Sequence, residues 1–566
     1  MTGAAQGVEP SETFRSRVVV CQQEDAANAG RDAMRRGGNA VDAAVATAFA
    51  LAVTHPAAGN IGGGGFIVAY LADSKEVITV DFREVAPGAA TERMYLGPDG
   101  KPLPDHRAGP LAAGVPGTVR GLGLAHARYG KSPWAELVRP AVDLARGGFA
   151  VSDTLARSLN AQLFPREAVN PAAVPEDLGS DPDRLADFAA SALAFRKPDG
   201  TPWREGDRLV QPDLAATLER IVTAGPDEFY TGETARRVVA HMQALGGLIS
   251  RDDLAGYQAK VRPPVRGTYR GFDVYGMGPP GSGGIVILQV LNILERYDLK
   301  ADGPRSPRTI HRVTEAMRRG FFTRATEVAD PDFVAVPVDR LVSKSHADAL
   351  AATITDRATP SATLAPFPIT IAEGAHTTHL STLDDRGNAV ALTYTLEEGY
   401  GSKSVVAGAG FLLNNEMGDF NLIPGRTDTS GRIGTPPNTI VPRKRMLSSM
   451  SPTLVLKDGK VRIITGSPGG RTIPNTTLWV ILNVLEFGMN PREAVHAMRT
   501  HHQWFPDVLS LEGTWDPATL EALRAMGHNL RTGGIQGDAH TIIIDGQGTI
   551  HGIPDPRRKT SRAAGD

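Results

Sequence analysis

The alternation of apolar and polar positions predicts a helix-rich first two-thirds of the chain. A helical pattern spans residues 26–36, the pair Gly37-Gly38 follows as a stop signal, and Asn39 can cap a second, strongly apolar helix that runs to Val53. Two short β-rich runs come next, at 66–71 and 76–82. Beyond them the pattern to about residue 352 is mostly helical, at 119–129, 135–145, 214–223, 234–245, 284–297 and 310–323.

The pattern changes after residues 355–376, a stretch without sustained periodicity that we interpret as an irregular connector. Three later segments each place a glycine-containing turn between alternating or β-branched runs, which predicts hairpins at 377–395, 452–466 and 539–553. Helical patterns accompany them at 476–487, 491–499 and 517–526. Together these elements predict a layered architecture of helices around an antiparallel sheet.

Composition and charge exclude several functional classes. The 60 basic and 62 acidic side chains give a net charge of −2, which leaves no positive excess for nucleic acid or an anionic membrane. The longest apolar stretch, 40–53, is shorter than the roughly 20 residues that span a bilayer. The single cysteine, Cys21, rules out intramolecular disulfides and metal sites built from several cysteines. No secretory signal is visible, so the sequence as written predicts a cytoplasmic protein, or a periplasmic or secreted one whose leader was removed.

The sequence does not match the familiar nucleotide-binding and hydrolase motifs. Gly130-Lys131-Ser132 is not a P-loop, because Ala125 stands where that motif requires a glycine. The glycine run 62–65 lacks GxGxxG spacing and follows a helical pattern where a dinucleotide fold needs a strand. The sequence also contains no HExxH and no GxSxG. These absences argue against a zinc protease and a serine α/β-hydrolase.

Thr377 opens the most informative hairpin. A turn centred near Arg386 places Thr377 opposite Thr395 on the partner strand, with Cβ atoms about 4.5–5.5 Å apart. A register error of one residue would move this pairing. Cross-strand threonine pairs are also common in strands with no catalytic role, so the spacing leaves a structural and a catalytic interpretation open.

Two further segments supply groups that acyl transfer requires. A strand at 461–465 runs into GSPGG (466–470) and then a helical pattern, so successive backbone N–H groups can point at one oxyanion. The segment LSSMSP (447–452) places the hydroxyls of Ser448 and Ser449 just before another strand. Taken alone, the glycine segment is better explained as a turn needed for packing, and the serines as hydroxyls of a turn or a helix N-cap.

Together these motifs closely resemble the γ-glutamyltranspeptidase (glutathione hydrolase) family of N-terminal nucleophile hydrolases. The resemblance covers nearly the whole chain and rests on TTHLS (377–381), LLNNEMGDF (412–420), KRMLSSMSPT (444–453), GSPGG (466–470), GGNAVDAAVA (37–46), THPAAGNIGGGGF (54–66) and DFREVAP (81–87). It implies an α+β fold, a four-layer αββα sandwich with two antiparallel sheets between helical layers. It also implies a precursor cut into residues 1–376 and 377–566, whose two pieces form one intertwined domain and pair as a heterodimer.

The resemblance further implies where the chemistry takes place. Thr377 would be the nucleophile, freed when the precursor cuts itself after His376. Its new α-amino group, with a pKa of about 7.7–8.0, would act as general base. Thr395 would orient the Thr377 hydroxyl, and Gly469 and Gly470 would hold the oxyanion.

The donor would be recognised at both ends of its amino-acid group. Arg83, together with Ser448 and Ser449, would bind the α-carboxylate, a task that suits the bidentate geometry of guanidinium. Glu416 and Asp419 would hold the α-ammonium. Such a clamp would select free γ-glutamyl amides over glutamates within a peptide chain.

The sequence departs from the family pattern in two places. Many relatives have an asparagine just after the TYT strand (393–395), whereas here Leu396 is followed by Glu397 and a second glutamate. We expect Glu397 either to strengthen ammonium binding or to reshape the pocket for another acyl group. The segment 421–446, a lid loop in some relatives, contains no aromatic residue, so we expect its closure to be weaker.

The sequence therefore predicts a ping-pong reaction. Thr377 takes the γ-glutamyl group from glutathione or another γ-glutamyl amide and passes it to water, an amino acid or a peptide. Two alternatives stay open: a related acylase acting on glutaryl groups of cephalosporin side chains, and an unprocessed protein that binds amino acids through the same groups. The prediction includes no metal, no organic cofactor, no nucleic acid and no membrane span.

Overall fold

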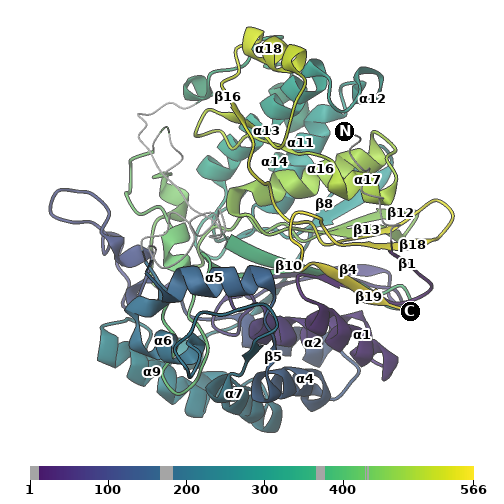
Figure 1. Cartoon of the computed structure of the whole chain (residues 1–566). Helices are drawn as coiled ribbons and strands as arrows, with labels where there is room; N and C mark the ends of the chain where they lie inside the picture. Colours follow the sequence, from purple (N-terminus) through teal and green to yellow (C-terminus); the bar gives the residue numbers. More distant parts are fainter. Residues whose placement is uncertain (1–11, 166–182, 365–375, 428, 430–432) are drawn as a thin grey trace, which may run out of the picture.

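The computed structural model describes residues 12–165, 183–364, 376–427, 429 and 433–566, and its fold has four layers. Figure 1 shows two sheets crossing the middle of the molecule, with helices above and below them. This arrangement is an αββα sandwich of the α+β class, as the sequence predicted. None of the helices in these ranges combines the length and apolar content needed to cross a bilayer.

Two antiparallel sheets of seven strands each form the centre of the described structure. Sheet I has the order β19 (Arg562–Gly565), β2 (Val18–Cys21), β10 (His376–Leu383), β11 (Ala389–Glu397), β3 (Gly64–Leu71), β4 (Glu76–Asp81) and β7 (Lys260–Arg262). Sheet II has the order β1 (Glu12–Phe14), β18 (Ile550–Ile553), β17 (Thr541–Ile544), β13 (Lys460–Thr465), β12 (Thr453–Lys457), β9 (Phe272–Gly276) and β8 (Val265–Tyr269). Strands from both sides of residue 377 occur in each sheet.

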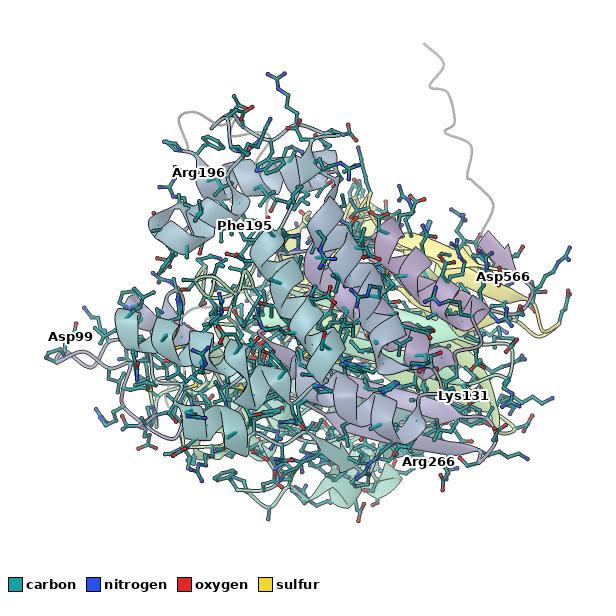
Figure 2. The ribbon with its side chains drawn as sticks, turned by 90° about the horizontal axis from the view of Figure 1, so that it is seen from below. Asp99, Lys131, Phe195, Arg196, Arg266 and Asp566 are labelled. Atoms are coloured by element: carbon teal, nitrogen blue, oxygen red, sulfur yellow. The ribbon has the colours of Figure 1, made fainter. Side chains whose placement is uncertain are left out.

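One helical layer covers the outer face of sheet I. Its helices are α1 (Glu24–Arg35), α2 (Ala40–Thr54), α3 (Thr118–Tyr129), α4 (Trp134–Gly147), α5 (Asp153–Leu163), α6 (Ala189–Phe195), α7 (Pro212–Ala224), α8 (Glu228–Thr231), α9 (Glu233–Leu245) and α10 (Arg251–Gly256). Figure 2 looks onto this layer from outside, with the C-terminal Asp566 at one edge and Asp99 at the opposite edge. A two-stranded ribbon, β5 (Phe149–Ala150) and β6 (Arg208–Leu209), lies among these helices.

A second layer covers the outer face of sheet II (Figure 1). Its helices are α11 (Gly283–Leu294), α12 (Leu299–Asp302), α13 (Pro307–Glu327), α14 (Val338–Leu341), α15 (Lys344–Ala351), α16 (Ile473–Leu485), α17 (Pro491–His496) and α18 (Pro517–Ala525). A small sheet of β14 (Thr500–His501), β15 (Leu509–Leu511) and β16 (Leu530–Thr532) accompanies them.

Helix α2 shows how the local sequence sets the fold. All of its residues are buried, as expected of a helix that is apolar on every side. The side chain of Asn39 accepts hydrogen bonds from the N–H groups of Val41 and Asp42, and Asp42 accepts the N–H of Asn39 in return. The predicted cap and the predicted buried helix are both confirmed.

A hydrophobic core lies between the two sheets, in addition to the cores beneath the two helical layers. Side chains at alternating strand positions point into it, as the period of two along a strand requires. Sheet I contributes Val18, Val20, Phe66, Val68, Leu383 and Ala391, and sheet II contributes Leu454, Leu456, Ile464 and Ile542. The sheets are thus held face to face by interdigitated apolar residues.

Five strands within the stretch predicted as mostly helical are a correction: the short strands β5 and β6, and the strands β7, β8 and β9. β7, β8 and β9 occupy residues 260–276, and the first two are edge strands whose residues are largely exposed or half-buried. Exposed edges lack the apolar alternation that reveals a half-buried strand, which explains why they were missed. The helix predicted at 491–499 ends at His496, and residues 365–375 of the predicted connector lie outside the described residues.

The hairpin β10–β11 has the predicted register. Pairs run from Leu383 opposite Ala389 to Thr378 opposite Tyr394, which fits a turn centred on residue 386. The register then shifts between His376 and Thr378. The predicted position of Thr377 opposite Thr395 therefore coincides with a local irregularity of the ladder. In Figure 1, β10 lies at the centre of the molecule between the two helical layers.

Candidate active site

One polar cavity brings together nine of the ten residues that the sequence singled out. It encloses about 370 Å³, its open mouth included. Those nine are Arg83, Thr377, Thr395, Glu397, Glu416, Asp419, Ser448, Ser449 and Gly470. Gly469 directly precedes Gly470 without lining the cavity. The lining also includes Arg324, Met450, Arg471 and Ile473, which the sequence analysis missed.

Thr377 and Thr395 lie on the neighbouring strands β10 and β11, and both are largely buried. The hydroxyl oxygen of Thr395 accepts the N–H of Glu397 at 2.7 Å. Glu397 has a φ of 80°, a left-handed conformation that is unusual outside glycine and accompanies this tight contact. Because the Thr395 oxygen accepts from the backbone, its own proton points elsewhere and is suited to donation within the cavity that it shares with Thr377.

The glycine turn after β13 depends on glycine at two positions. Gly469 has a φ of 126° and Gly470 a φ of 54°, both in regions that side chains disfavour. A Cβ on Gly469 would also overlap with the hydroxyl of Thr472. The turn leads into a short 3₁₀ segment and then α16, so its backbone amides lie near a helix N-terminus, where negative charge is stabilised.

Arg83 is fully buried and paired with acidic neighbours. Its guanidinium lies 2.6 Å from Glu416, contacts Asp419, and lies 3.5 Å from Glu84. Burial alone would lower the pKa of Arg83, but these carboxylates raise it above its usual value. The groups predicted to hold opposite ends of an amino acid are therefore in direct contact with each other.

Two acids that line the cavity, Glu416 and Glu397, hold protons more tightly than ordinary carboxylates do. Burial raises the pKa of Glu416 well above its usual range, against the opposing effect of Arg83. Burial also raises the pKa of Glu397, and the neighbouring carboxylates raise it further. Neither oxygen of Glu416 has a hydrogen-bond partner among the described residues. Oε2 forms the ion pair with Arg83, so the buried Oε1 is the oxygen suited to a cationic ligand.

Ser448, the first of the two predicted serines, is fixed by the loop before α11. Ser448 donates its N–H to Pro280 at 3.0 Å, and its carbonyl accepts both the N–H and the hydroxyl of Ser282. Ser282 in turn accepts the Nε–H of Arg324 at 3.0 Å. Arg324, on α13, thereby connects the loop that holds Ser448 to the lining of the polar cavity. An arginine within an otherwise buried helical pattern was the available sequence signal for it.

A second cavity of about 640 Å³, its mouth included, meets the polar cavity at Thr377. Its lining comes from the residues just before α1 and just after α2, from the start of α5, from the loop after β11, from the glycine turn and from the C-terminal segment. These residues are Gln22, Gln23, His55, Ala57, Ala58, Ser152, Thr154, Leu155, Ser158, Gly399, Pro468, Arg558 and Thr560. Pro468 lines this cavity while Gly470 of the same turn lines the other. Thr377 and the glycine turn therefore stand at the boundary between the two.

The single cysteine takes no part in either cavity. Cys21 is fully buried, and burial raises the pKa of its thiol to about 12. A thiol with so high a pKa is a poor nucleophile near neutral pH.

Comparison with known proteins agrees with this geometry. The family model for γ-glutamyltranspeptidase matches residues 26–565. The glutathione hydrolase proenzyme of Escherichia coli (strain K12) is 43% identical over 97% of this chain and 91% of its own length. The acylase ACY 1 proenzyme of Pseudomonas sp. (strain SE83) is 37% identical over 94% of this chain and 91% of its own.

The solved structures give the same result. The cephalosporin acylase from Bacillus halodurans superposes with a TM-score of 0.84 at 26% identity, covering 100% of this chain and 98% of its own. The matching family model and the named relatives are those of hydrolytic and acyl-transferring enzymes, which confirms the predicted class of enzyme. The chain therefore belongs to the γ-glutamyltranspeptidase family.

Proposed function

We propose that this chain is a γ-glutamyltransferase and glutathione hydrolase whose precursor cuts itself between His376 and Thr377. The pieces, residues 1–376 and 377–566, would stay together as a heterodimer. One observation carries the proposal: a buried threonine at the start of a strand shares a single cavity with a glycine turn, three arginines, two serines and three carboxylic acids. Few other reactions need that combination.

Cleavage would create the general base. While Thr377 is bonded to His376 its nitrogen is an amide and cannot accept a proton, whereas the freed α-amine has a pKa of about 7.7–8.0. The amine takes the hydroxyl proton as the Thr377 oxygen attacks the γ-carbonyl carbon of the donor. Thr395, which accepts the N–H of Glu397, would direct its own hydroxyl proton toward the nucleophile.

The tetrahedral intermediate would place its negative oxygen at the N–H groups of Gly469 and Gly470. Removing one such donor typically costs about 2.7–4 kcal/mol in the transition state. As the C–N bond breaks, the α-ammonium of Thr377 returns its proton to the leaving amine and an ester remains. Water or an acceptor amine then attacks this ester and restores the free hydroxyl, so atoms and protons balance over the cycle.

The ion pairs of Arg83 support a mode of recognition in which the charged groups of the donor replace the present partners of these side chains. The α-carboxylate of the donor would join Ser448 and Ser449 at the guanidinium, while its α-ammonium would take the place of that guanidinium beside Glu416 and Asp419. Every charge stays paired in this exchange, which avoids the cost of burying an isolated ion. The unpartnered oxygen of Glu416 supports the ammonium position.

The second cavity offers space for the leaving group and the acceptor. The reacting carbon of the intermediate carries four substituents, of which three are the Thr377 oxygen, the oxyanion and the acyl chain in the polar cavity. The fourth, the leaving amine, would point across the boundary formed by Thr377 and the turn between Pro468 and Gly470. An acceptor amine attacks the ester from the same side that the leaving group departs.

Replacement of the nucleophile tests the proposal. Wild-type protein should give two bands of about 40 and 20 kDa on denaturing electrophoresis, and it should release aniline from a γ-glutamyl anilide. Thr377→Ala should remain one band and show no turnover, whereas Thr377→Ser keeps a hydroxyl and should retain both activities in part. Turnover in Thr377→Ala would overturn the assignment.

A glutaryl acylase is the second candidate, because Glu397 reshapes the site and acylases occur among the relatives. Glu397, Glu416 and Asp419, which line the cavity, favour a donor with an α-ammonium over a glutaryl group that lacks one. We therefore expect γ-glutamyl anilide to exceed glutaryl anilide in kcat/KM by about tenfold or more, as charge-assisted hydrogen bonds require. A reversed preference would favour the acylase, and an intact mass after storage would favour a silent amino-acid-binding protein.

A further inference from the structure

A buried histidine joins the nucleophile strand to the opposite sheet. His540 directly precedes β17 of sheet II and is inaccessible to solvent. Its Nδ1 lies 2.6 Å from the carbonyl oxygen of His379, two residues along β10 from Thr377. Its Nε2 lies 3.3 Å from a carboxylate oxygen of Asp538 and 3.2 Å from the hydroxyl of Ser561. β10 pairs with β2 only from Ser381 to Leu383. On this side, His540 therefore holds the part of β10 that lies nearer to Thr377.

The partners of His540 define its protonation. A carbonyl oxygen only accepts hydrogen bonds, so Nδ1 carries a proton, and the carboxylate of Asp538 likewise requires a proton on Nε2. Burial by itself would lower the pKa of His540, but Asp538, with a smaller effect of Asp555, raises it above the usual value. Both ring nitrogens of His540 therefore face acceptors, the arrangement that suits an imidazolium.

The neighbouring His379 is neutral, so the charged ring of His540 does not stack on a second positive ring. Its ring stacks on His540, with centroids 6.4 Å apart and planes 10° from parallel. Ser381 donates its hydroxyl proton to the carbonyl of His540, so its oxygen accepts from Nε2 of His379, while Nδ1 accepts from Thr393. Burial and the charge of His540 both lower the pKa of His379.

The residues just before His540 also contact the glycine turn. The N–H of Asp538 donates to the hydroxyl of Ser467 at 2.8 Å, and this hydroxyl donates to the carbonyl of Pro468 at 2.7 Å. Gly537 packs so closely on Ser467 that a Cβ there would overlap with its hydroxyl. Residues 537–540 thus contact β10 through one end and the turn 466–470 through the other.

We propose that His540, held by Asp538, is a positioning residue that sets the distance between the nucleophile Thr377 and the glycine turn. The inference rests on the proposed function, since it takes Thr377 as nucleophile and the turn as oxyanion site. These two elements lie at the ends of strands in different sheets, and their relative position decides whether attack and oxyanion stabilisation coincide. His540 touches no lining residue of the polar cavity through its ring, so donor binding itself should be spared.

Substitutions at His540 should therefore lower kcat and leave the donor KM nearly unchanged. A misplacement of about 1 Å costs on the order of 100-fold in rate, which is the loss we expect for His540→Phe, with KM within a factor of about three. His540→Asn keeps a donor toward the carbonyl of His379 and should recover part of the rate. Self-cleavage should slow in the same order, because it uses the same hydroxyl.

The pH profile separates positioning from general destabilisation. The rate rises with pH as the Thr377 amine loses its proton and falls again when His540 loses its own. Asp538→Asn keeps the hydrogen-bonding shape but removes the charge, so the pKa of His540 drops and the alkaline limb moves to lower pH. The charged groups facing His540 are Asp538 and Asp555, and the neutral ring of His379 faces it from β10.

A matched histidine and aspartate pair provides the control. His551 lies 3.1 Å from Asp545 in the adjacent hairpin β17–β18 and lines neither cavity. His551→Phe and Asp545→Asn should leave kcat and the alkaline limb unchanged. Wild-type kcat in His540→Phe, or an unmoved alkaline limb in Asp538→Asn, would overturn the inference, and the second variant decides if the first does not fold. A wild-type protein without γ-glutamyl turnover would instead refute the proposed function.

Discussion

Glu397 is the residue through which pH should control donor binding. Its carboxyl lines the polar cavity, and burial raises its pKa well above the usual carboxyl range. It attracts the donor ammonium only when ionised, so the donor KM of the wild type should fall as the pH rises through this raised pKa. Glu397→Gln removes the titrating group, and its KM should vary less with pH.

Kinetics with a γ-glutamyl anilide from about pH 6 to about pH 9 measure this effect, spanning the raised carboxyl range. We expect kcat/KM of Glu397→Gln to be lower by about tenfold at the alkaline end, since hydrogen bonds to charged groups are worth about 1.5–3 kcal/mol. Glu521→Gln is the control, because Glu521 is exposed on α18 and lines neither cavity. Parallel curves for wild type and Glu397→Gln would contradict the prediction.

Glu84 should make the protein less stable at alkaline pH. It is fully buried beside Arg83, and burial raises its pKa to about 8 from an ordinary value of 4.5. Between these two pKa values the folded state binds the proton more tightly than the unfolded state, so unfolding free energy falls as pH rises through that window. The loss is complete above the folded pKa.

The isosteric variant Glu84→Gln should therefore raise Tm at about pH 9 by a few degrees relative to wild type, and change it less at about pH 5. Thermal unfolding at the two pH values measures the difference. An equal change in Tm at both would mean that the proton on Glu84 is not what limits alkaline stability. Gln at this position keeps the side-chain volume, so packing is not altered.

At the level of elements, the glycine turn should tolerate no side chain beside the oxyanion. Gly469→Ala forces a residue into a φ of 126° and into contact with the hydroxyl of Thr472, which displaces the neighbouring amides. We expect kcat to fall by about 100- to 1,000-fold with little change in KM, as for loss of one oxyanion donor. Gly488→Ala, at a φ of 64° in open space after α16, also places a side chain at positive φ but without a steric overlap, and it should leave kcat unchanged.

Helix α5 offers a way to separate transfer from hydrolysis. Thr154 lines the second cavity, whereas the adjacent Asp153 is exposed and does not. Thr154→Tyr should narrow the cavity, so transfer to a dipeptide acceptor falls several-fold while water still reaches the ester. Asp153→Tyr should leave the ratio unchanged. Product analysis with and without dipeptide measures both rates, and an unaltered ratio in Thr154→Tyr would argue that acceptors bind elsewhere.

Elements with strong local signals could be predicted, and long-range arrangements could not. The register of β10–β11 follows from a turn centred on residue 386, and the cap at Asn39 follows from its own neighbours. The irregularity between His376 and Thr378 leaves no mark in the hydrophobic pattern or the turn signal of the hairpin. Arg83 showed no local sign of burial, and its pairing with Glu416 joins residues more than 300 positions apart. Only the resemblance to a family placed them in one site.

At the scale of the whole molecule, cleavage after residue 376 should not separate the two pieces. Strands from both pieces alternate within sheets I and II, and the C-terminal strand β19 pairs with β2 near the start of the chain. Arg35 of α1 also forms an ion pair with Asp566. Neither piece can complete a sheet without the other, so the cut chain should behave as one particle of about 60 kDa in native chromatography.

The same interleaving predicts that refolding depends on concentration only after cleavage. In the uncleaved Thr377→Ala precursor the two pieces share one chain, which gives them an effective concentration in the millimolar range. In the cut enzyme they must meet by diffusion, and each alone exposes unpaired strand edges that favour aggregation. After denaturation and dilution, the yield of refolded precursor should stay constant from micromolar to nanomolar protein, whereas that of the cut enzyme should fall with dilution. Circular dichroism and native chromatography measure both yields; equal yields at every dilution would mean that one piece folds alone and serves as a template for the other.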